Sequence, residues 1–536
     1  MNLPDQTTDT PLAEQIAKRR TFAIISHPDA GKTTLTEKLL LYSGMIHTAG
    51  MVRGRKGRKA AASDWMAMEQ ERGISITASA MQFIYKDTVI NVLDTPGHED
   101  FSEDTYRTLT AADCAIMVID AAKGVEKQTR KLFEVCRIRK IPVLTFINKM
   151  DMPGQDPLDL MNEVENVLQI QSSALNWPIG TGKEFIGVYD RTTQECLLFT
   201  KISAGGAQKA ETARYPIDSA ELKNKINPEQ LQQLKQELEL LDIAGNTFNH
   251  EDFLAGRVTP VFFASALTNF GVESFFDAFI HLAPSPQKRI ATRLNGEELP
   301  IDPVTHGFSA YVFKIQANMD KRHRDSMAFL RVCSGKFERD MVVRHHRLGR
   351  EVRLSRPHGM VAGERTTVDA AYAGDVIGVI NPGMFAVGDS ISLSGGFNFK
   401  PLPQFQPEIF ARVIPKDIGK RKSFDKGVIQ LTEEGAIQLL RPFDLSGDLI
   451  FAAVGQLQFE VMQYRLKDEY GVETILNNLP YQCSAWLIGD LATFQKPSTA
   501  VIMRDRQERP MVLFGEQWEK QYAMKQNPNH QLVDIL

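Results

Sequence analysis

The segment after the first apolar run carries residues suited to holding phosphate. The run Phe22–Ile25 leads into this segment, and a helical pattern begins at Lys32. Backbone N–H groups and the positive helix end can cradle phosphates, while a lysine reaches the terminal phosphates and a threonine hydroxyl binds Mg²⁺. We therefore predict a phosphate-binding loop made of Ser26, His27, Pro28, Asp29, Ala30, Gly31, Lys32, Thr33 and Thr34, with Thr33 as the metal ligand.

The first position of this loop departs from the usual pattern. Ser26 stands where a glycine is expected. An ordinary strand-to-helix turn that happens to contain Gly31 and Lys32 is the alternative interpretation. A serine can make the turn if its φ is negative, so we expect the substitution to be tolerated.

A second group of polar residues follows the apolar strand predicted over Thr88–Leu93. Ligands of α/β folds bind at the carboxyl ends of strands. We predict that Asp94 holds Mg²⁺ through water, that the Gly97 amide senses the terminal phosphate, and that His98 orients an attacking water. A solvent-exposed histidine without a ligand is the alternative for His98. The predicted nucleotide-binding residues of this segment are Asp94, Thr95, Pro96, Gly97 and His98.

A further hydroxyl lies upstream, in the segment Glu69–Ile76. Ser75 is our candidate for a second hydroxyl on Mg²⁺, and a loop serine without a ligand is the alternative. We expect this segment and the one that follows Asp94 to be ordered by the terminal phosphate and released on hydrolysis.

Two more strand ends carry residues that can recognise a purine base. Asp151 can accept hydrogen bonds from N1–H and the exocyclic amine of guanine, a pair of donors that adenine lacks. The stem of Lys149 can pack on the base, and Asn148 can brace the loop. Such a site rejects the wrong partner by about 10⁴ to 10⁵, which favours GTP over ATP; a helix-capping loop is the alternative. The predicted base-binding residues are Asn148, Lys149, Met150, Asp151, Ser265, Ala266 and Leu267.

The elements that position these residues alternate between strands and helices. Such alternation is typical of a doubly wound α/β domain with a parallel-rich sheet, here a P-loop domain. The predicted strands are Phe22–Ile25, Thr88–Leu93, Ala115–Ile119, Val143–Ile147 and Pro260–Ala264. The predicted helices are Lys32–Leu41, Phe101–Ala111, Glu126–Arg139 and Val272–Leu282.

The chain is predicted to divide into three domains. Pro284 and Pro286 end the alternation, because prolines this close together cannot continue a helix. From Gly307 to Leu393, short alternating runs punctuated by glycine predict a small β-barrel. Beyond Phe405, strands and helices mix in an α+β pattern. The predicted domains are 1–286, with extra structure inserted at about 156–257, then 300–395 and 400–536.

Composition limits the class of protein. The formal net charge of -4 argues against binding nucleic acid by bulk electrostatics, although the basic run Arg53–Lys59 is either an RNA contact or a solvated loop. No run approaches the roughly 20 apolar residues that span a bilayer. The five cysteines form no CxxC pair, which disfavours disulfide and zinc frameworks. We therefore expect a cytoplasmic protein.

The motifs together resemble a known family. The runs IISHPDAGKTT, ERGISI, DTPGHEDF, INKMD and ASAL are similar to those of translational GTPases. The later runs GFSAYVFKIQ and AAVGQLQFEV extend the resemblance over nearly the whole chain, to the bacterial peptide chain release factor 3 family. Ser26, Ser75 and the long stretch between Asp151 and Ser265 fit that family too.

The resemblance implies a ribosome-stimulated GTPase of translation termination that uses Mg²⁺. Its partners would be the ribosome, both RNA and protein, and class I peptide chain release factors, which it would dissociate and recycle. We expect slow hydrolysis without ribosomes, because no arginine finger can be assigned in the chain. We also expect a monomer with no membrane or DNA partner. The alternatives are another ribosomal factor, acting in elongation, rescue or stress, and a GTP-regulated binding module that does not hydrolyse GTP.

Overall fold

A seven-stranded sheet forms the centre of the first part of the molecule. Strand β1 lies between β3 and β4, in the order β2-β3-β1-β4-β5-β11-β6. All neighbours pair in parallel except β2 and β3, which form an antiparallel hairpin. The strands are β1 (Arg19–Ser26), β2 (Ser79–Tyr85), β3 (Thr88–Asp94), β4 (Cys114–Asp120), β5 (Val143–Asn148), β6 (Gln171–Ala174) and β11 (Val258–Phe263). The parallel-rich sheet that the sequence predicted is confirmed.

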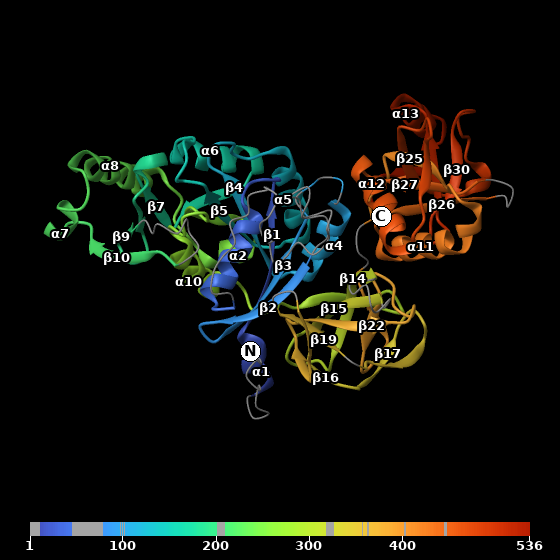
Figure 1. Ribbon diagram of the computed structural model, residues 1–536, viewed down its shortest axis with the longest axis horizontal. Helices are drawn as coiled ribbons and strands as arrows, with labels where there is room; N and C mark the ends of the chain where they lie inside the picture. The colour runs from blue at the N-terminus through green and yellow to red at the C-terminus, as the bar shows by residue number, and fades with distance from the viewer. Residues whose placement is uncertain are drawn as a thin grey trace.

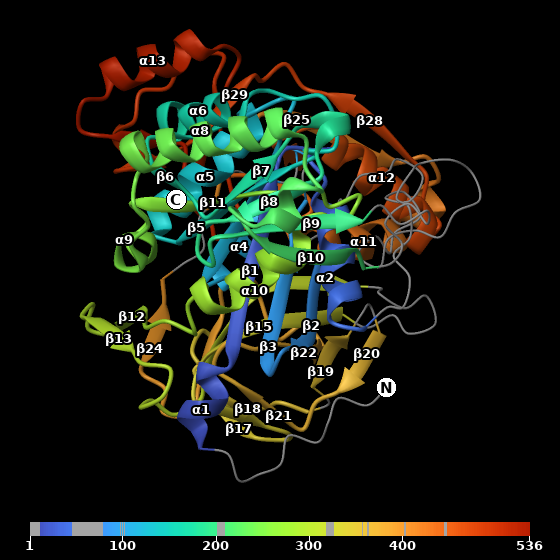
Figure 2. The ribbon, with the colours of Figure 1, turned by 90° about the vertical axis from the view of Figure 1, so that its left-hand side faces the viewer.

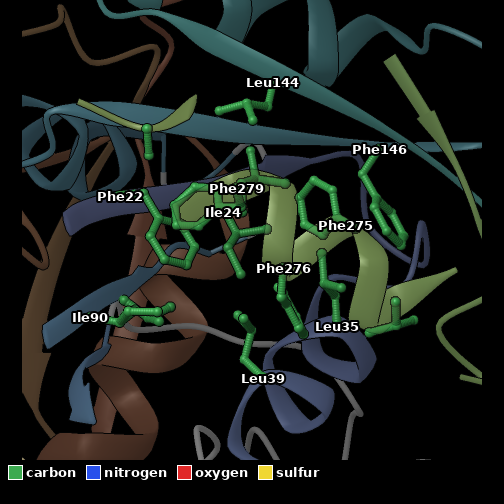
Figure 3. Packing of buried hydrophobic residues seen from close by; sticks show 14 of the residues in the cluster. Phe22, Ile24, Leu35, Leu39, Ile90, Leu144, Phe146, Phe275, Phe276 and Phe279 are labelled. Atoms are coloured by element: carbon green, nitrogen blue, oxygen red, sulfur yellow. The ribbon is translucent and has the colours of Figure 1, made fainter. Parts of the chain in front are cut away.

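Helices cover both faces of this sheet, because alternate strand residues point to opposite sides. Phe22 and Ile24 pack on one side with α2 (Lys32–Tyr42) and α10 (Val272–Leu282). Figure 3 shows the phenylalanines of α10 lying against these β1 side chains. The other face packs against α4 (Ser102–Ala111), α5 (Lys127–Arg139) and α6 (Pro157–Leu168). A short helix, α1 (Leu12–Ala17), precedes β1.

The computed structural model describes most of the chain. The described residues are 11–45, 79–96, 98, 100, 102–200, 209–317, 326–355, 357–361, 364–400, 404–443 and 448–536. Within them, no helix is long and apolar enough to cross a membrane. The basic run 53–59 and Ser75 lie outside the described residues, as does Gly97.

The segment predicted to hold extra structure has two parts. Its first helix and strand, α6 and β6, complete the main sheet. The remainder forms a separate four-stranded antiparallel sheet with helices, which projects at the left of Figure 1 and faces the viewer in Figure 2. Its elements are β7 (Asn176–Ile179), β8 (Gly187–Asp190), β9 (Glu195–Thr200), β10 (Glu211–Pro216), α7 (Ala220–Lys223) and α8 (Pro228–Ala244), and α9 (His250–Leu254) leads back to β11.

The middle of the chain forms a curled antiparallel β unit. Its main sheet has eight strands in the order β18-β17-β23-β14-β15-β22-β19-β20 around its own apolar cluster. They are β14 (Ser309–Ala317), β15 (Ser326–Ser334), β17 (Val342–His345), β18 (Arg350–Arg353), β19 (His358–Val361), β20 (Glu364–Thr367), β22 (Val376–Asn381) and β23 (Ser390–Ser392). Smaller sheets are built from β12 (Arg289–Arg293), β13 (Glu298–Ile301) and β24 (Phe397–Phe399), and from β16 (Lys336–Glu338) and β21 (Ala370–Tyr372).

The last part is an α+β unit, drawn in orange and red in Figure 1. Its eight-stranded antiparallel sheet packs against helices α11 (Arg421–Glu434), α12 (Gln456–Tyr470) and α13 (Gln517–Gln526). The strands are β25 (Ile409–Pro415), β26 (Gln438–Pro442), β27 (Ile450–Ala453), β28 (Thr474–Asn478), β29 (Cys483–Ile488), β30 (Val501–Arg504), β31 (Pro510–Phe514) and β32 (Gln531–Val533). The predicted fold class is therefore confirmed in all three parts.

A buried polar cluster joins the first two parts. Arg331 of β15, which is 1% exposed, pairs with Asp113 and donates to the Thr21 hydroxyl of β1 at 2.6 Å. Beside it, Arg19 of β1 binds Asp375 at 2.8 Å. Because both arginines are paired and hydrogen-bonded, their charges can be buried between the units.

Candidate nucleotide-binding and hydrolysis site

The predicted site residues gather where parallel strands end. Ser26 ends β1, Asp94 ends β3 and Asn148 ends β5, and Asp120, which was not predicted, ends β4 at the same edge. The register places Ser26 beside Val118 of β4, and Asp120 beside Asn148. This edge is where a doubly wound sheet binds its ligands.

The loop between β1 and α2 has the conformation of a phosphate cradle. Gly31 has φ +101°, and a Cβ there would lie 2.2 Å from Asn148 Nδ2, so only glycine fits. Helix α2 begins at Lys32 without a side-chain cap from Gly31. The first N–H groups of a helix can therefore face an anion at this end.

Asn148 ties the phosphate loop to the base-binding loop. Its Nδ2 donates to the carbonyl of Ala30 at 2.8 Å, and its Oδ1 accepts from the amide of Ala266 at 2.9 Å. Asn148 is 2% exposed. Segments more than 100 positions apart in the chain are thus brought together by one side chain.

The base-binding loop presents a buried carboxylate. Asp151 Oδ1 is buried and has no hydrogen-bond partner among the described residues. Lys149, with φ +70°, is held by Asp120 through an ion pair of 2.7 Å between Nζ and Oδ2. The loop of Ser265 is closed by its amide, which donates to the Phe270 carbonyl at 2.9 Å. A buried carboxylate oxygen needs a donor, and guanine supplies two.

Asp120 was missed from the sequence, although a signal was there. It follows the apolar strand predicted over Ala115–Ile119, which is the same strand-end position that identified Asp94. Helix α5 and its N-cap supply two more residues that were missed. Thr129 Oγ1 accepts from the amide of His27 at 3.1 Å, and the N-cap residue Glu126 lies 3.3 Å from Nε2 of His27.

The donor set at the end of β3 suits Mg²⁺. Asp94 is 2% exposed, and its Oδ1 lies 3.9 Å from Lys32 Nζ. Thr33 follows Lys32 at the start of α2. Mg²⁺ prefers hard oxygen ligands and retains waters, so one carboxylate and one hydroxyl fit. Thr95 anchors the strand end, since its hydroxyl donates to the Ile24 carbonyl at 2.6 Å.

His98 lies just beyond this carboxylate and is 38% exposed. Its Nδ1 accepts from the amide of Asp100 at 3.3 Å, and it lies 3.3 Å from Asp100 Oδ1. The histidine therefore has one ring nitrogen engaged within its own loop.

Comparisons with known families cover the three parts of the chain. Residues 17–285 match the elongation factor Tu GTP binding domain, and residues 307–394 match elongation factor G domain 2. Residues 399–524 match the class II release factor RF3 C-terminal domain. The fold and the site thus define a translational GTPase.

Curated relatives narrow this class. A peptide chain release factor 3 from Synechocystis is 52% identical over 511 residues, covering 95% of this chain and 92% of the relative. That from Gloeobacter violaceus is 52% identical, covering 98% of both chains. That from Symbiobacterium thermophilum is 51% identical, covering 96% of this chain and 97% of the relative. The chain belongs to the peptide chain release factor 3 family.

A solved structure from Thermus thermophilus shares the fold. It matches with a TM-score of 0.68 at 20% identity, covering 91% of this chain and 72% of that chain. At this identity the likeness concerns the fold alone.

Proposed function

We propose that the chain is a ribosome-stimulated GTPase of translation termination, which promotes dissociation and recycling of class I peptide chain release factors. The observation that carries the enzymatic part is the Asn148 bridge, in which one side chain is hydrogen-bonded to both the predicted phosphate loop and the predicted base loop. The family relationship supports the termination part. We further propose that it acts in the cytoplasm as a monomer.

Guanine recognition rests on Asp151 in this proposal. Its buried Oδ1 has no partner among the described residues and accepts from the base, while the stem of Lys149, fixed by Asp120, packs on the ring. In the loop of Ser265, Ala266 and Leu267, the first two amides already donate to Phe270 and Asn148, so the amide of Leu267 is the one proposed to face the guanine carbonyl. Adenine would leave the carboxylate unsatisfied, which costs affinity.

The phosphates bind at the start of α2. Amides of the loop from Ser26 to Thr34 and the Lys32 ammonium hold their oxygens. Thr33 and Asp94 would hold Mg²⁺, the latter through water, with Ser75 as a second hydroxyl. The metal neutralises charge that develops on the phosphates. Gly97 senses the terminal phosphate and His98 orients the attacking water.

The decisive experiment measures phosphate release from GTP and from ATP, each with and without ribosomes. We expect turnover of GTP to rise by about 10³-fold or more with ribosomes, and turnover of ATP to stay at background. Equal use of ATP would contradict the role of Asp151. No stimulation by ribosomes would favour a GTP-regulated binding module.

A second arm tests the termination role. A fluorescently labelled class I factor is bound to ribosomes whose peptide has been released, and its dissociation is followed. We expect the chain with GTP to accelerate dissociation, and the chain without nucleotide to do so much less. Stimulated hydrolysis without accelerated dissociation would assign the chain to another ribosomal process.

A further inference from the structure

The catalytic loop is in contact with the third part of the chain through one carboxylate. Asp100 lies two residues after His98, and its Oδ2 accepts from the amide of Leu457 at 2.7 Å. Leu457 belongs to the first turn of α12, whose N-cap is Gly455. Because glycine has no capping side chain, the cap of this helix comes from the first domain.

The approach of the two units depends on that glycine. A Cβ at Gly455 would lie 2.0 Å from the carboxyl carbon of Asp100. Gly455 has φ -145°, which any residue adopts. The glycine is therefore required for the close approach of Asp100 and not for the turn of the backbone.

The same residue contacts the histidine. The Asp100 amide donates to Nδ1 of His98 at 3.3 Å, and Asp100 Oδ1 lies 3.3 Å from the same ring nitrogen. The Asp100 side chain is only 13% exposed. A carboxylate at the N-terminus of a helix is stabilised there. The Asp100 side chain is therefore restrained beside the His98 ring as long as α12 is docked.

Helix α4, which follows this loop, reinforces the docking. The ring of Tyr106 lies 4.1 Å from that of Phe405, measured between centroids. Arg107 reaches the carbonyl of Glu434 at 3.5 Å, and a Cβ at Gly435 would lie 2.0 Å from its Nη1. The third domain therefore contacts the loop and the helix after it as a unit.

We infer that Asp100 is a positioning residue through which the docked third domain restrains His98 and slows hydrolysis away from the ribosome. This inference rests on the proposed function. Ordering the loop around the terminal phosphate requires His98 to turn toward water, and that movement draws Asp100 away from Leu457. Coupling between two sites is reciprocal. If docking of the third domain disfavours the loop conformation that GTP stabilises, GTP weakens docking of the third domain by the same free energy.

The test is Gly455→Ala, whose methyl group displaces the Asp100 carboxylate from Leu457 while neither His98 nor Asp100 is itself substituted. We expect the rate constant of GTP hydrolysis without ribosomes to rise roughly 3- to 10-fold, as loss of a helix cap allows, with KM for GTP unchanged. Gly307→Ala is the matched control, because a Cβ there meets only ordinary contact at 3.7 Å. Asp100→Ala removes the same cap and is expected to raise the rate too.

The double variant Gly455→Ala with His98→Ala shows whether the effect passes through the histidine. We expect no gain over His98→Ala alone. A gain that persists, or an unchanged or lower rate in both folded single variants, would overturn the inference. The unmodified protein separates the two claims. If ribosomes do not stimulate its GTP hydrolysis, the proposed function is wrong. If they do, and the rates of the Gly455 and Asp100 variants without ribosomes are unchanged, only this inference is wrong.

Discussion

At the scale of single residues, the site depends on buried polar groups whose partners are fixed. The side-chain amide of Asn148 donates to the backbone of one loop and accepts from the backbone of another. Asp120 forms an ion pair with Lys149. Asp151 differs, since its Oδ1 has no partner among the described residues. A group of this kind is the first place to test the chemistry.

Asp151→Asn is expected to lower affinity for GTP by about 10²-fold. Asparagine offers one acceptor and one donor, whereas guanine presents two donors. Xanthine presents one donor and one acceptor, so binding of xanthosine triphosphate should improve. Titration with fluorescent nucleotides measures both. Asp159→Asn, at an exposed position of α6, is the control, and equal loss there would refute the assignment.

His98→Ala is expected to lower the ribosome-stimulated rate by about 10² to 10⁴, because the group proposed to orient the attacking water is lost. Affinity for GTP should stay within about twofold, since the ring of His98 is hydrogen-bonded to Asp100 within its own loop. Single-turnover phosphate release and nucleotide titration separate the two effects. An unchanged stimulated rate would remove His98 from the mechanism.

The cysteines give a prediction with a defined pH dependence. All five are free and buried. Burial raises the pKa of Cys136 to about 12 and that of Cys333 to about 11, so the reactive thiolate is scarce below these values. We expect no rapid reaction with a disulfide reagent at pH 8 and full reaction in denaturant. A fast thiol in the native protein would contradict the packing.

At the scale of elements, alternation along β1 explains why the site is rigid. Phe22 and Ile24 bury on one face, and Ala23 and Ile25 on the other. A shift of the strand by one residue would expose the apolar side chains of one face. The position of Ser26 at its end is therefore fixed relative to the neighbouring strands. The same applies to its neighbours, so their terminal polar residues form one constellation.

Gly31→Ala is expected to weaken nucleotide binding at least about 10-fold. The new Cβ would strain a backbone with φ +101° and press on Asn148 Nδ2 at 2.2 Å, and strain alone costs about 1–3 kcal/mol. Gly256→Ala is the control, because its φ is +71° with nothing within 4 Å. It should lose stability but keep affinity. Calorimetric titration with GTP distinguishes the two, and equal affinity of both variants would contradict the proposed cradle.

At the scale of the whole molecule, the first and second parts are joined by buried charge, and the third docks on the loop after β3. Arg331 and Arg19 are each nearly inaccessible and paired across the first interface. The third part meets the first through Asp100 and α4. The contact of the third part with Asp100 therefore lies two residues from His98 in the chain.

Arg331→Ala is expected to lower the free energy of unfolding by about 3–5 kcal/mol, since it leaves Asp113 buried with a partner lost. Arg353→Ala is the matched control on β18, because its side chain is 66% exposed and its ion pair contributes about 0–1 kcal/mol. Denaturant unfolding followed by circular dichroism gives both values. Similar losses would mean that the buried pair does not hold the interface.

The division of the chain into domains at 1–286, 300–395 and 400–536 stays a prediction, whereas the fold class is confirmed. Periodicity sufficed for the α/β alternation because each strand buries both faces. It did not show that α6 and β6 extend the main sheet while the next strands form a sheet of their own. Pairing of that kind depends on contacts between distant segments.

The sequence by itself determined the alternation of strands and helices, and it predicted the phosphate loop and the base-reading residues, because these depend on local spacing and on the chemistry of single side chains. Only the tertiary structure decided that Asn148 bridges two loops, that Asp120 fixes Lys149, and that Asp100 caps a helix of another domain. Each of these contacts joins residues far apart in the chain. Their energies depend on distance in space, which no local pattern records.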